Sequence, residues 1–225
     1  MSRLPVGIHN PVLPTLPVHV MEAPVEGPTV IIQGGIHGDE IAGVHAIQEL
    51  LEADLRPARG RLVVIPVMNP AAYRARNRCA PGGLDLNRCF PGDPESTELE
   101  RRLAAFFMAL VQAEQPALVA TLHESKTRYH PEVHPSFGQT LVYGVTPVPH
   151  PLTRAVERLN QTIQGEDERW ATHYYPVSTS STEVIVDAVG CVGTCVETWM
   201  GFPLQRRVEM QREVVLTLLS EFEVI

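Results

Sequence analysis

Short runs of β-branched and aliphatic residues alternate with longer stretches of helical periodicity, and this alternation limits the fold more than any other feature of the chain. The runs at residues 29–32 and 62–67 are followed by apolar positions at three- and four-residue spacing, at 41–51 and at 99–110. Because helices that connect parallel strands cover the faces of a sheet, this order predicts an α/β fold with a mixed, largely parallel central sheet sandwiched by helices. Further strands are expected at residues 117–122, 140–143, 184–186 and 191–198, and further helices at 152–163 and from near Pro203.

The length of 225 residues suits one domain, because compact domains seldom exceed about 250 residues before they divide. Hydrophobic residues make up 44 % of the chain and charged residues 20 %, which is typical of a globular protein with a sizeable core. No internal repeat or low-complexity segment is visible, and no linker follows residue 20. We therefore expect residues 1–225 to form a single domain.

The chain is acidic, with 18 Lys and Arg against 26 Asp and Glu and a formal charge of -8. This charge gives no general attraction for nucleic acid or for an anionic membrane surface. Prolines at 5, 11, 14 and 17 interrupt any apolar segment of a signal peptide, and no stretch approaches the roughly 18 apolar residues of a membrane span. The sequence thus favours a cytoplasmic protein without a nucleic-acid or membrane partner, and it leaves the oligomeric state open.

Four cysteines stand at positions 79, 89, 191 and 195. They are too few for a disulfide scaffold in a chain of this length, and their spacings differ from those of paired zinc ligands. We expect reduced thiols, most of them buried.

Three long segments, at residues 69–96, 124–138 and 165–182, lack apolar periodicity. Stretches of this length without structure of their own are usually functional in compact domains, so the active site is expected among them. Thr97 and Glu100 have the spacing of a capping box, which predicts that a helix begins directly after the first segment.

The first candidate site is a His-x-x-Glu motif, formed by His37 and Glu40 directly after the first predicted strand. On the first turn of a helix, side chains three residues apart face the same side, so the imidazole and the carboxylate can share a zinc ion. Gly34, Gly35 and Gly38 let the backbone turn sharply and approach a ligand closely. Because the same spacing also arises by chance, the motif alone leaves metal binding open.

A zinc hydrolase needs a third protein ligand and an open fourth position for water. His123 is the candidate, because it follows the run at 117–122 and strand ends in open α/β sheets converge on the ligand crevice. A structural histidine at a strand end is the alternative. His130 and His134 have the spacing of a helical zinc pair, but a proline follows each of them, so we interpret both as loop residues.

Two further positions carry groups suited to catalysis. Asn87 and Arg88 stand side by side in a segment rich in basic residues, and an amide beside a guanidinium can grip a carboxylate, although a solvated loop with ion pairs has the same composition. Glu197 is the single acidic residue at the end of an otherwise apolar strand. Near a zinc-bound water it would act as general base and pass the proton to the leaving amine, whereas an exposed strand end is the alternative.

Taken together and in order, these segments resemble the zinc carboxypeptidase superfamily, and most closely its succinylglutamate desuccinylase and aspartoacylase branch. Each motif is weak or moderate alone, but five in the right order between residues 34 and 197 are highly specific. The motifs are Gly35-x-His37-x-x-Glu40, Asn69-Pro70, Asp85-Leu-Asn87-Arg88-x-Phe-Pro-Gly, Leu122-His123 and Val196-Glu197-Thr.

The resemblance implies a zinc carboxypeptidase-like fold, one zinc ion and a set of site residues. The family places an arginine upstream of the Asp-Leu-Asn-Arg motif to polarise the scissile carbonyl, which we assign to Arg78, with Arg76 and Arg74 as alternatives. Peptidases of the superfamily also use a tyrosine on a mobile loop; Tyr174 and Tyr175 lie in about the matching place, and we take Tyr175 as the candidate for substrate binding. The remaining implied roles are zinc ligation by His37, Glu40 and His123, carboxylate binding by Asn87 and Arg88, and general-base catalysis by Glu197.

We therefore predict a zinc-dependent hydrolase that cleaves an amide bond in a small-molecule or peptide substrate with a free carboxylate. A carboxypeptidase and an N-acyl amino acid deacylase are the two versions, and the sequence does not choose between them. A catalytically silent metal-containing binding module of the same fold is the alternative from a different class. Desuccinylases and aspartoacylases continue into a C-terminal β domain, whereas 28 residues follow Glu197 here, so we expect a single hydrolase domain that lacks the β domain.

Overall fold

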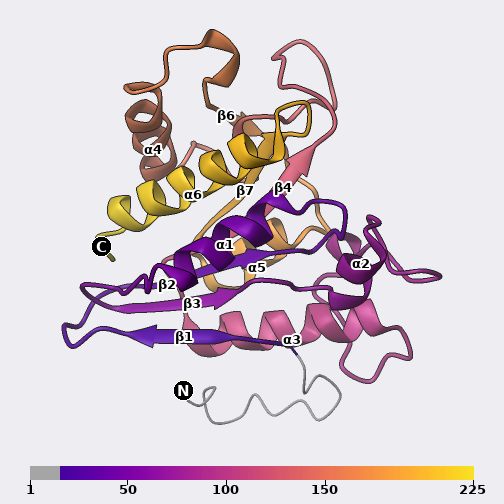
Figure 1. Cartoon of the computed structure of the whole chain (residues 1–225). Coiled ribbons are helices and arrows are strands. Elements are labelled where there is room, and N and C mark those ends of the chain that lie inside the picture. The colour runs from indigo at the N-terminus through magenta and orange to yellow at the C-terminus, as the bar shows by residue number, and fades with distance from the viewer. Residues whose placement is uncertain (1–15) are drawn as a thin grey trace.

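The structure is a computed structural model and describes residues 16–225. Within this range, seven strands form one sheet in the order β1-β3-β2-β4-β7-β5-β6 (Figure 1). The strands are β1 His19–Glu22, β2 Thr29–Gly34, β3 Arg61–Ile65, β4 Leu118–Ser125, β5 Thr140–Tyr143, β6 Ala171–Tyr174 and β7 Val192–Trp199. The helices are α1 Ala42–Glu52, α2 Pro70–Ala75, α3 Leu99–Glu114, α4 His150–Asn160, α5 Ser181–Val189 and α6 Leu204–Glu221, with short 3-10 helices η1 Leu86–Arg88 and η2 Glu166–Glu168.

The centre of the sheet consists of four parallel strands, β3, β2, β4 and β7. At one edge β1 runs antiparallel to β3, and at the other edge β5 runs antiparallel to β7 and parallel to β6. Val30 of β2 pairs with Leu62 on one side and with Leu118 on the other, so three of the apolar runs in the sequence form adjacent strands. The predicted mixed, largely parallel sheet is therefore confirmed.

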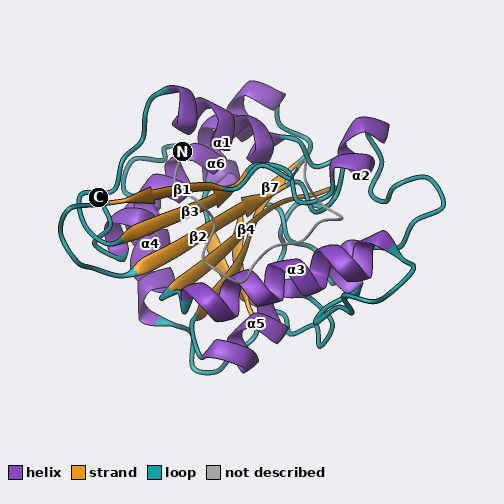
Figure 2. Ribbon diagram, turned by 90° about the horizontal axis from the view of Figure 1, so that it is seen from below, coloured by secondary structure: helices purple, strands orange, loops and turns teal. Residues whose placement is uncertain are grey.

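Helices cover both faces of the sheet, with α1, α4 and α6 on one face and α3 and α5 on the other (Figure 2). Successive side chains of each central strand point to opposite faces and so supply both cores. On β2, Val30 and Ile32 belong to the core that contains Leu218 of α6, whereas Ile31 belongs to the core that contains Phe107 of α3. Because both faces are buried, the central strands are apolar at successive positions rather than at alternate ones.

The strand order reverses at β2, because the chain leaves β2 for β3 on one side while β4 lies on the other side. In open α/β sheets, ligands bind in the crevice outside the carboxyl ends of the strands at such a reversal. The loop at residues 35–41 follows β2 directly, and the carboxyl ends of β4 and β7 lie beside it in the sheet. The topology thus gathers at one edge the three segments that carry the predicted site.

The strand predicted at residues 184–186 is wrong, because these residues lie inside helix α5. The side chain of Ser180 accepts a hydrogen bond from the backbone N–H of Glu183 and caps the helix, and Gly190 ends it with a φ of 69°. Ile185 is buried in the core against α3. A capped start, a glycine end and one buried side chain therefore outweigh the β propensity of three residues.

Helix α3 begins at Leu99 as expected, but the predicted capping box does not form. Its N-cap residue is Glu98, which makes no side-chain capping hydrogen bond, and the carboxylate-bearing Glu100 is buried instead. The segments predicted to lack structure also contain the short elements α2, η1, η2 and β6, which span between 3 and 6 residues each. Elements this short give no detectable periodicity.

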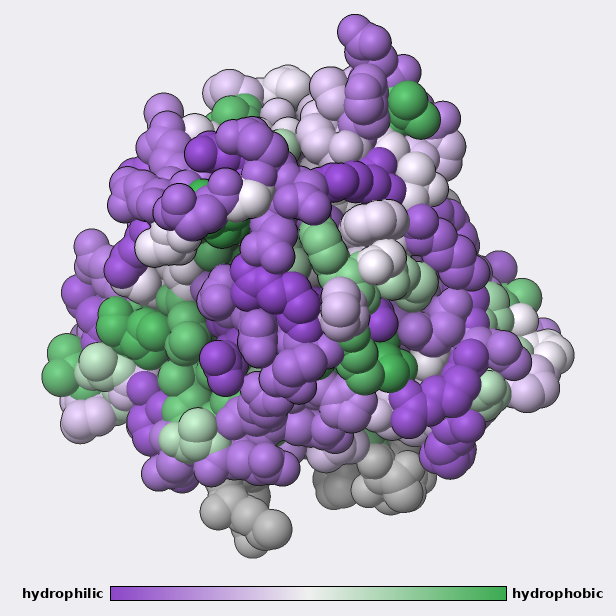
Figure 3. All heavy atoms as spheres, turned by 45° about the horizontal axis from the view of Figure 1, so that its top comes forward, coloured by the Kyte–Doolittle hydropathy of each residue, from purple (hydrophilic) through white to green (hydrophobic). Residues whose placement is uncertain are grey.

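The face of the molecule in Figure 3 is mostly hydrophilic, with apolar residues in separate patches. Within residues 16–225, every helix is too short or too polar to cross a lipid bilayer. The prolines at 5, 11 and 14, which carried the argument about a signal peptide, lie outside the described residues. All four cysteines are free thiols, and Cys89, Cys191 and Cys195 are buried, as expected.

Candidate active site

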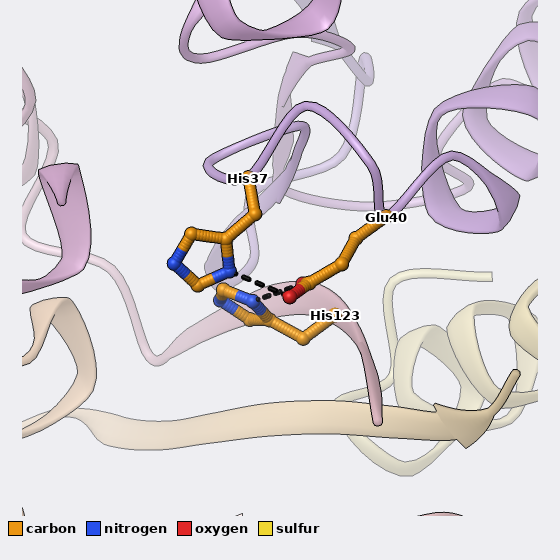
Figure 4. Close-up of side chains that lie close together, drawn as sticks. All are labelled: His37, Glu40 and His123. Carbon is orange, nitrogen blue, oxygen red and sulfur yellow. Dashed lines mark hydrogen bonds and ion pairs between the residues drawn. The ribbon is translucent and has the colours of Figure 1, made fainter. Parts of the chain in front are cut away.

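Three side chains from two separate segments of the chain meet at the carboxyl ends of β2 and β4 (Figure 4). His37 and Glu40 lie in the loop between β2 and α1, and His123 lies on β4. Nδ1 of His37 is 2.7 Å from Oε1 of Glu40, and Nδ1 of His123 is 2.7 Å from Oε2. All three residues are buried, with exposed fractions between 2 % and 5 %. The carboxylate therefore bridges two imidazoles, and we call this group the triad.

Glycines hold the loop of the triad against helix α2. Gly35 has a φ of +64°, in the left-handed region that favours glycine, and its carbonyl accepts a hydrogen bond of 2.8 Å from the backbone N–H of Asn69. Gly38 lies so close to α2 that a Cβ there would be 1.9 Å from the carbonyl oxygen of Ala72. The side chain of Asn69 in turn caps α2 by accepting from the Ala72 N–H at 3.1 Å. These contacts set the position of the two ligands on the loop.

The donor set and the charges of the triad fit one divalent metal ion. Its three ligand atoms lie within 4.8 Å of one another, and two histidines with one carboxylate form a usual zinc-binding set. Although burial raises the pKa of Glu40, His37 and His123 lower it far below the ordinary value. Burial lowers the pKa of His123, yet Cys195 and Glu40 raise it well above the ordinary value. An ionised carboxylate beside an imidazole that holds its proton is a group in which a metal ion can replace that proton.

Asp85 links the triad to an arginine. Its Oδ1 is 3.1 Å from Nε2 of His37, and its Oδ2 accepts from Nε and Nη2 of Arg78 at 3.1 and 2.9 Å. Nη1 of Arg78 is directed at the triad, 3.5 Å from Oε1 of Glu40. A carboxylate behind a metal-binding histidine fixes the orientation of the ring and makes the ring a better ligand. Asp85 therefore positions both the ligand His37 and the cation that faces the triad.

Helix α6 supports the triad from behind. Gln211 is fully buried, and its Nε2 donates to the backbone carbonyl of His123 at 2.7 Å. Arg207 pairs with the buried carboxylate of Glu124, whose other oxygen accepts from the backbone N–H of Ala42 at 2.9 Å. One buried ion pair thus ties α6 to the end of β4 and to the start of α1.

Glu197 lies on β7, where it is the register partner of His123 on β4. Burial raises the pKa of Glu197 well above its ordinary value, and the nearby Glu40 adds to this effect while His123 opposes it. A carboxyl group whose pKa is raised toward neutrality is better suited to take up and return a proton.

A pocket of about 280 Å³ opens over the triad. The two alternative arginines, Arg74 and Arg76, do not line it, and the ring of Tyr73 holds the Arg76 guanidinium at 4.8 Å. Tyr174 does not line it either, because its ring packs on that of Tyr143. The residues predicted from the sequence that do line the pocket are His37, Glu40, Arg78, Asn87, Arg88, His123, Tyr175 and Glu197.

Helix α5 sets the orientation of Asn87. The backbone N–H and the hydroxyl of Ser181 both donate to Oδ1 of Asn87, at 3.0 and 3.1 Å. The amide NH₂ of Asn87 is therefore the group available to a ligand. Arg88 donates one N–H to the backbone carbonyl of Asn87 at 2.9 Å, and the rest of its guanidinium is available at the pocket that it lines.

The pocket also contains residues that the sequence did not indicate, among them Tyr143, Glu183 and Cys195. Although burial raises the pKa of the Cys195 thiol, His123 lowers it to about 7. The period of two along a strand could have indicated Cys195, because it lies two residues before Glu197 and so faces the same side. Glu183 gave no such signal, because its segment was predicted to be partly loop and partly strand.

His130 and His134 lie between β4 and β5, in a loop as predicted. The ring of His134 stacks on that of His173 with centroids 5.5 Å apart, and Nδ1 of His130 accepts from the backbone N–H of Glu132. Among residues 16–225, the group of side chains that could hold a metal is the triad, so neither histidine competes with it.

The fold and the triad together define a carboxypeptidase-like α/β domain with a His-x-x-Glu and His metal site. Residues 26–132 match the family model of the succinylglutamate desuccinylase/aspartoacylase catalytic domain. The matched range contains all three members of the triad, together with Asp85, Asn87 and Arg88. The resemblance inferred from the sequence is confirmed over residues 26–132, a range that includes the whole triad.

One curated protein and two solved structures are similar to this chain. The N-alpha-acetyl-L-2,4-diaminobutyric acid deacetylase of Halomonas elongata is 43 % identical over 89 residues, which are 38 % of this chain and 26 % of that protein. The tripeptide-bound cell shape determinant protein Csd4 from Helicobacter pylori has a TM-score of 0.82 at 17 % identity, over 94 % of this chain and 56 % of that one. A succinylglutamate desuccinylase/aspartoacylase from Rhodobacter sphaeroides has a TM-score of 0.71 at 25 % identity, over 93 % and 60 %. The chain thus spans 26 % of the curated relative and little more than half of the solved chains.

Replacement of Asp85 by Asn should weaken metal binding about 10- to 100-fold, because the His37 ring loses the carboxylate that orients it. Competition of the protein with a chelator of known zinc affinity measures this change. Asp93→Asn is the matched control, because Asp93 lies in the same segment but is exposed and bonds only locally, to the N–H of Glu95. Equal zinc affinity in the two variants would contradict the role given to Asp85.

Replacement of Arg207 by Met should lower the free energy of unfolding by about 3–5 kcal/mol, because the Glu124 side chain is fully buried and loses its cation. Urea denaturation measures the change. Arg212→Met on the same helix removes a partly exposed pair with Glu49 and should cost no more than about 1 kcal/mol. Adding Glu124→Gln to the Arg207 variant should restore part of the stability; no recovery would show that the unpaired charge is not the cause.

Proposed function

We propose that the chain is a zinc-dependent hydrolase that removes the acyl group from an N-acyl α-amino acid. The single observation that carries the proposal is that the triad, the Arg78 cation, the half-buried carboxyl group of Glu197 and the pair Asn87 and Arg88 all line one pocket. The 43 % identity with a curated deacetylase over 89 residues supports deacylation over peptide cleavage. The likeness to Csd4 supports the fold alone, at 17 % identity.

His37, Glu40 and His123 would hold the ion and leave its remaining face to the pocket. Zinc at such a site supplies Lewis acidity, which polarises an acyl carbonyl and makes water more acidic. Three protein ligands with an open pocket are typical of catalytic zinc, whereas a structural site is closed by four protein ligands. This argues against a silent binding module.

Glu197 would take the proton from the attacking water and return it to the leaving amine. Its position opposite His123 in the sheet brings its carboxyl group to the triad side of the pocket, and burial raises its pKa, which makes the carboxylate a stronger base. Arg78 would stabilise the negative charge that develops on the carbonyl oxygen. The two hydrogen bonds that Arg78 donates to Asp85 hold the guanidinium in place before the substrate arrives, so little reorganisation is needed.

Asn87 and Arg88 would bind the carboxylate of the substrate's amino acid. The fixed amide of Asn87 and the free N–H groups of Arg88 are donors, and a carboxylate accepts two such bonds at once. The ring of Tyr175, packed edge-on against Phe137 at 4.9 Å, lines the same pocket and would contact the bound substrate.

Replacement of Glu197 by Gln should leave zinc binding within about threefold and lower kcat by about 10²-fold or more, because the variant lacks the proton acceptor. Hydrolysis of N-acetyl amino acids and zinc content are the two measurements. A variant that retains most of its kcat would refute the assignment of the base. If wild-type protein releases C-terminal residues from peptides but leaves N-acetyl amino acids intact, the peptidase version of the hydrolase is the correct one.

Replacement of Arg88 by Ala should raise KM by about tenfold for substrates with a free carboxylate, while amidated analogues lose much less. Steady-state kinetics with paired acid and amide substrates measure the difference. Arg74→Ala is the matched control, because Arg74 lies in the same basic segment but does not line the pocket. An equal rise of KM for acid and amide substrates would contradict the binding of the substrate carboxylate by Arg88.

A further inference from the structure

The carboxylate of Glu183 lines the pocket but has no role in the mechanism above. Glu183 lies in the first turn of α5, two residues after Ser181, which holds the carboxylate-binding Asn87. Glu183 and Asn87 line the same pocket, and Cα atoms two positions apart on a helix are separated by roughly 5.5 Å. A small molecule held by Asn87 is therefore within reach of the Glu183 side chain.

The helix does not explain the position of this side chain. Ser180 and Glu183 have the sequence of a capping box, in which the glutamate side chain would accept from the backbone N–H of Ser180. That N–H is bonded instead to the carbonyl of Val177 at 2.8 Å, and only the forward half of the box forms, from the Glu183 N–H to the Ser180 hydroxyl. The carboxylate is thus turned away from its usual capping partner.

One oxygen of the Glu183 carboxylate, Oε2, is buried and has no hydrogen-bond partner among the described residues. Burial raises the pKa of Glu183, and Asp187 adds to this effect while the backbone N–H of Val177 opposes it. No ion pair within residues 16–225 involves Glu183. Glu183 as a whole is half-buried, but a buried carboxylate oxygen without a donor is costly, so Oε2 calls for a partner that the described residues do not supply.

Two other acidic side chains of the pocket have a cation beside them. Glu124 pairs with Arg207, and Asp39 lies 3.7 Å from the ammonium of Lys126. Glu183 instead packs against the end of β5, where a Cβ on Gly144 would lie 2.5 Å from its Oε1. The glycine is what makes room for the carboxylate at this wall. Tyr143 and Tyr175 line the same pocket, and aromatic rings favour a cationic group over an anionic one.

We propose, on the basis of the proposed deacylase function, that Glu183 selects substrates whose amino acid carries a short cationic side chain. The α-carboxylate lies at Asn87 and Arg88, and the side-chain ammonium forms an ion pair with Glu183 at the wall made by Gly144. The preferred substrates are N-acyl derivatives of α,ω-diamino acids, with the acyl group on the α-nitrogen.

Pairs of substrates that differ only in charge test this proposal. N-α-acetyl-2,4-diaminobutyrate and N-acetylnorvaline have side chains of equal length, as do N-α-acetylornithine and N-acetylnorleucine. The wild-type protein should show kcat/KM about tenfold or more higher for the cationic member of at least one pair, since a bond between charged groups contributes over 1 kcal/mol. Glu183→Gln should remove most of that ratio, and Glu183→Lys should reverse it.

Two further variants separate recognition from general damage. Gly144→Ala should reduce the same ratio, because the new methyl group displaces the Glu183 carboxylate without removing it. Glu157→Gln removes an equal charge from an exposed position on α4 that does not line the pocket, and should leave the ratio unchanged. If Glu183→Gln does not fold, as judged by circular dichroism, the Gly144 variant decides the matter.

A measurement of binding without turnover distinguishes this inference from the proposed function. Calorimetry with free 2,4-diaminobutyrate, ornithine, norvaline and norleucine reports recognition by the zinc-loaded protein without turnover. Tighter binding of the cationic amino acids, lost in Glu183→Gln, supports the inference even if no acetylated substrate is hydrolysed, and the deacylase function alone then fails. Hydrolysis of neutral and cationic substrates at equal rates, or a cationic preference that persists in Glu183→Gln, overturns the inference and leaves the deacylase function intact.

Discussion

The buried, ionised carboxylate of Glu40 is the constraint on which the rest of the site depends. Each of its oxygens lies 2.7 Å from a histidine Nδ1, and Oε2 also accepts from the backbone N–H of Glu124 at 3.2 Å. Burying a lone carboxylate costs several kcal/mol, so this arrangement is stable only where positive charge is concentrated on it. Two neighbouring parallel strands provide this, because β2 and β4 end at the same edge and bring together side chains 83 residues apart in sequence.

Contacts between polar and charged groups extend outward from Glu40 in two directions. On one side they run through His37 to Asp85 and on to Arg78, which is 47 % exposed and reaches the pocket. On the other side Glu124, which follows the ligand His123, is matched by Arg207 of α6. Each carboxylate along these two sets of contacts has a partner, so the geometry of the triad is imposed before a metal ion or a substrate binds. The net charge of -8 therefore says little about the site, which is balanced locally.

The triad could be predicted from the sequence because its signals are local. His37 and Glu40 are three residues apart behind a strand, and His123 ends an apolar run that is recognisable by itself. The contacts that orient the site are not local: Gln211 reaches His123 over 88 residues, and Ser181 reaches Asn87 over 94. Only the order of the motifs, through the family resemblance, indicated which histidine and which arginine belong together. Nothing in that resemblance indicated α5, whose β-branched residues 184–186 favour a strand.

The error over α5 matters, because this helix connects the two halves of the pocket. As a strand, the segment would present no capped first turn, and Oδ1 of Asn87 would lose both donors of Ser181. Asn87 stands two residues after Asp85, whose Oδ1 accepts from the Asn87 backbone N–H at 3.0 Å and also orients His37. The triad thus stands at the ends of parallel strands, whereas Asn87 is held by helix α5. The short 3-10 helix η1, which carries Asn87 directly after Asp85, joins these two parts of the pocket. Under the proposed function, changes in α5 and in the end of β5 would therefore alter which amino acid is bound while the triad keeps its place.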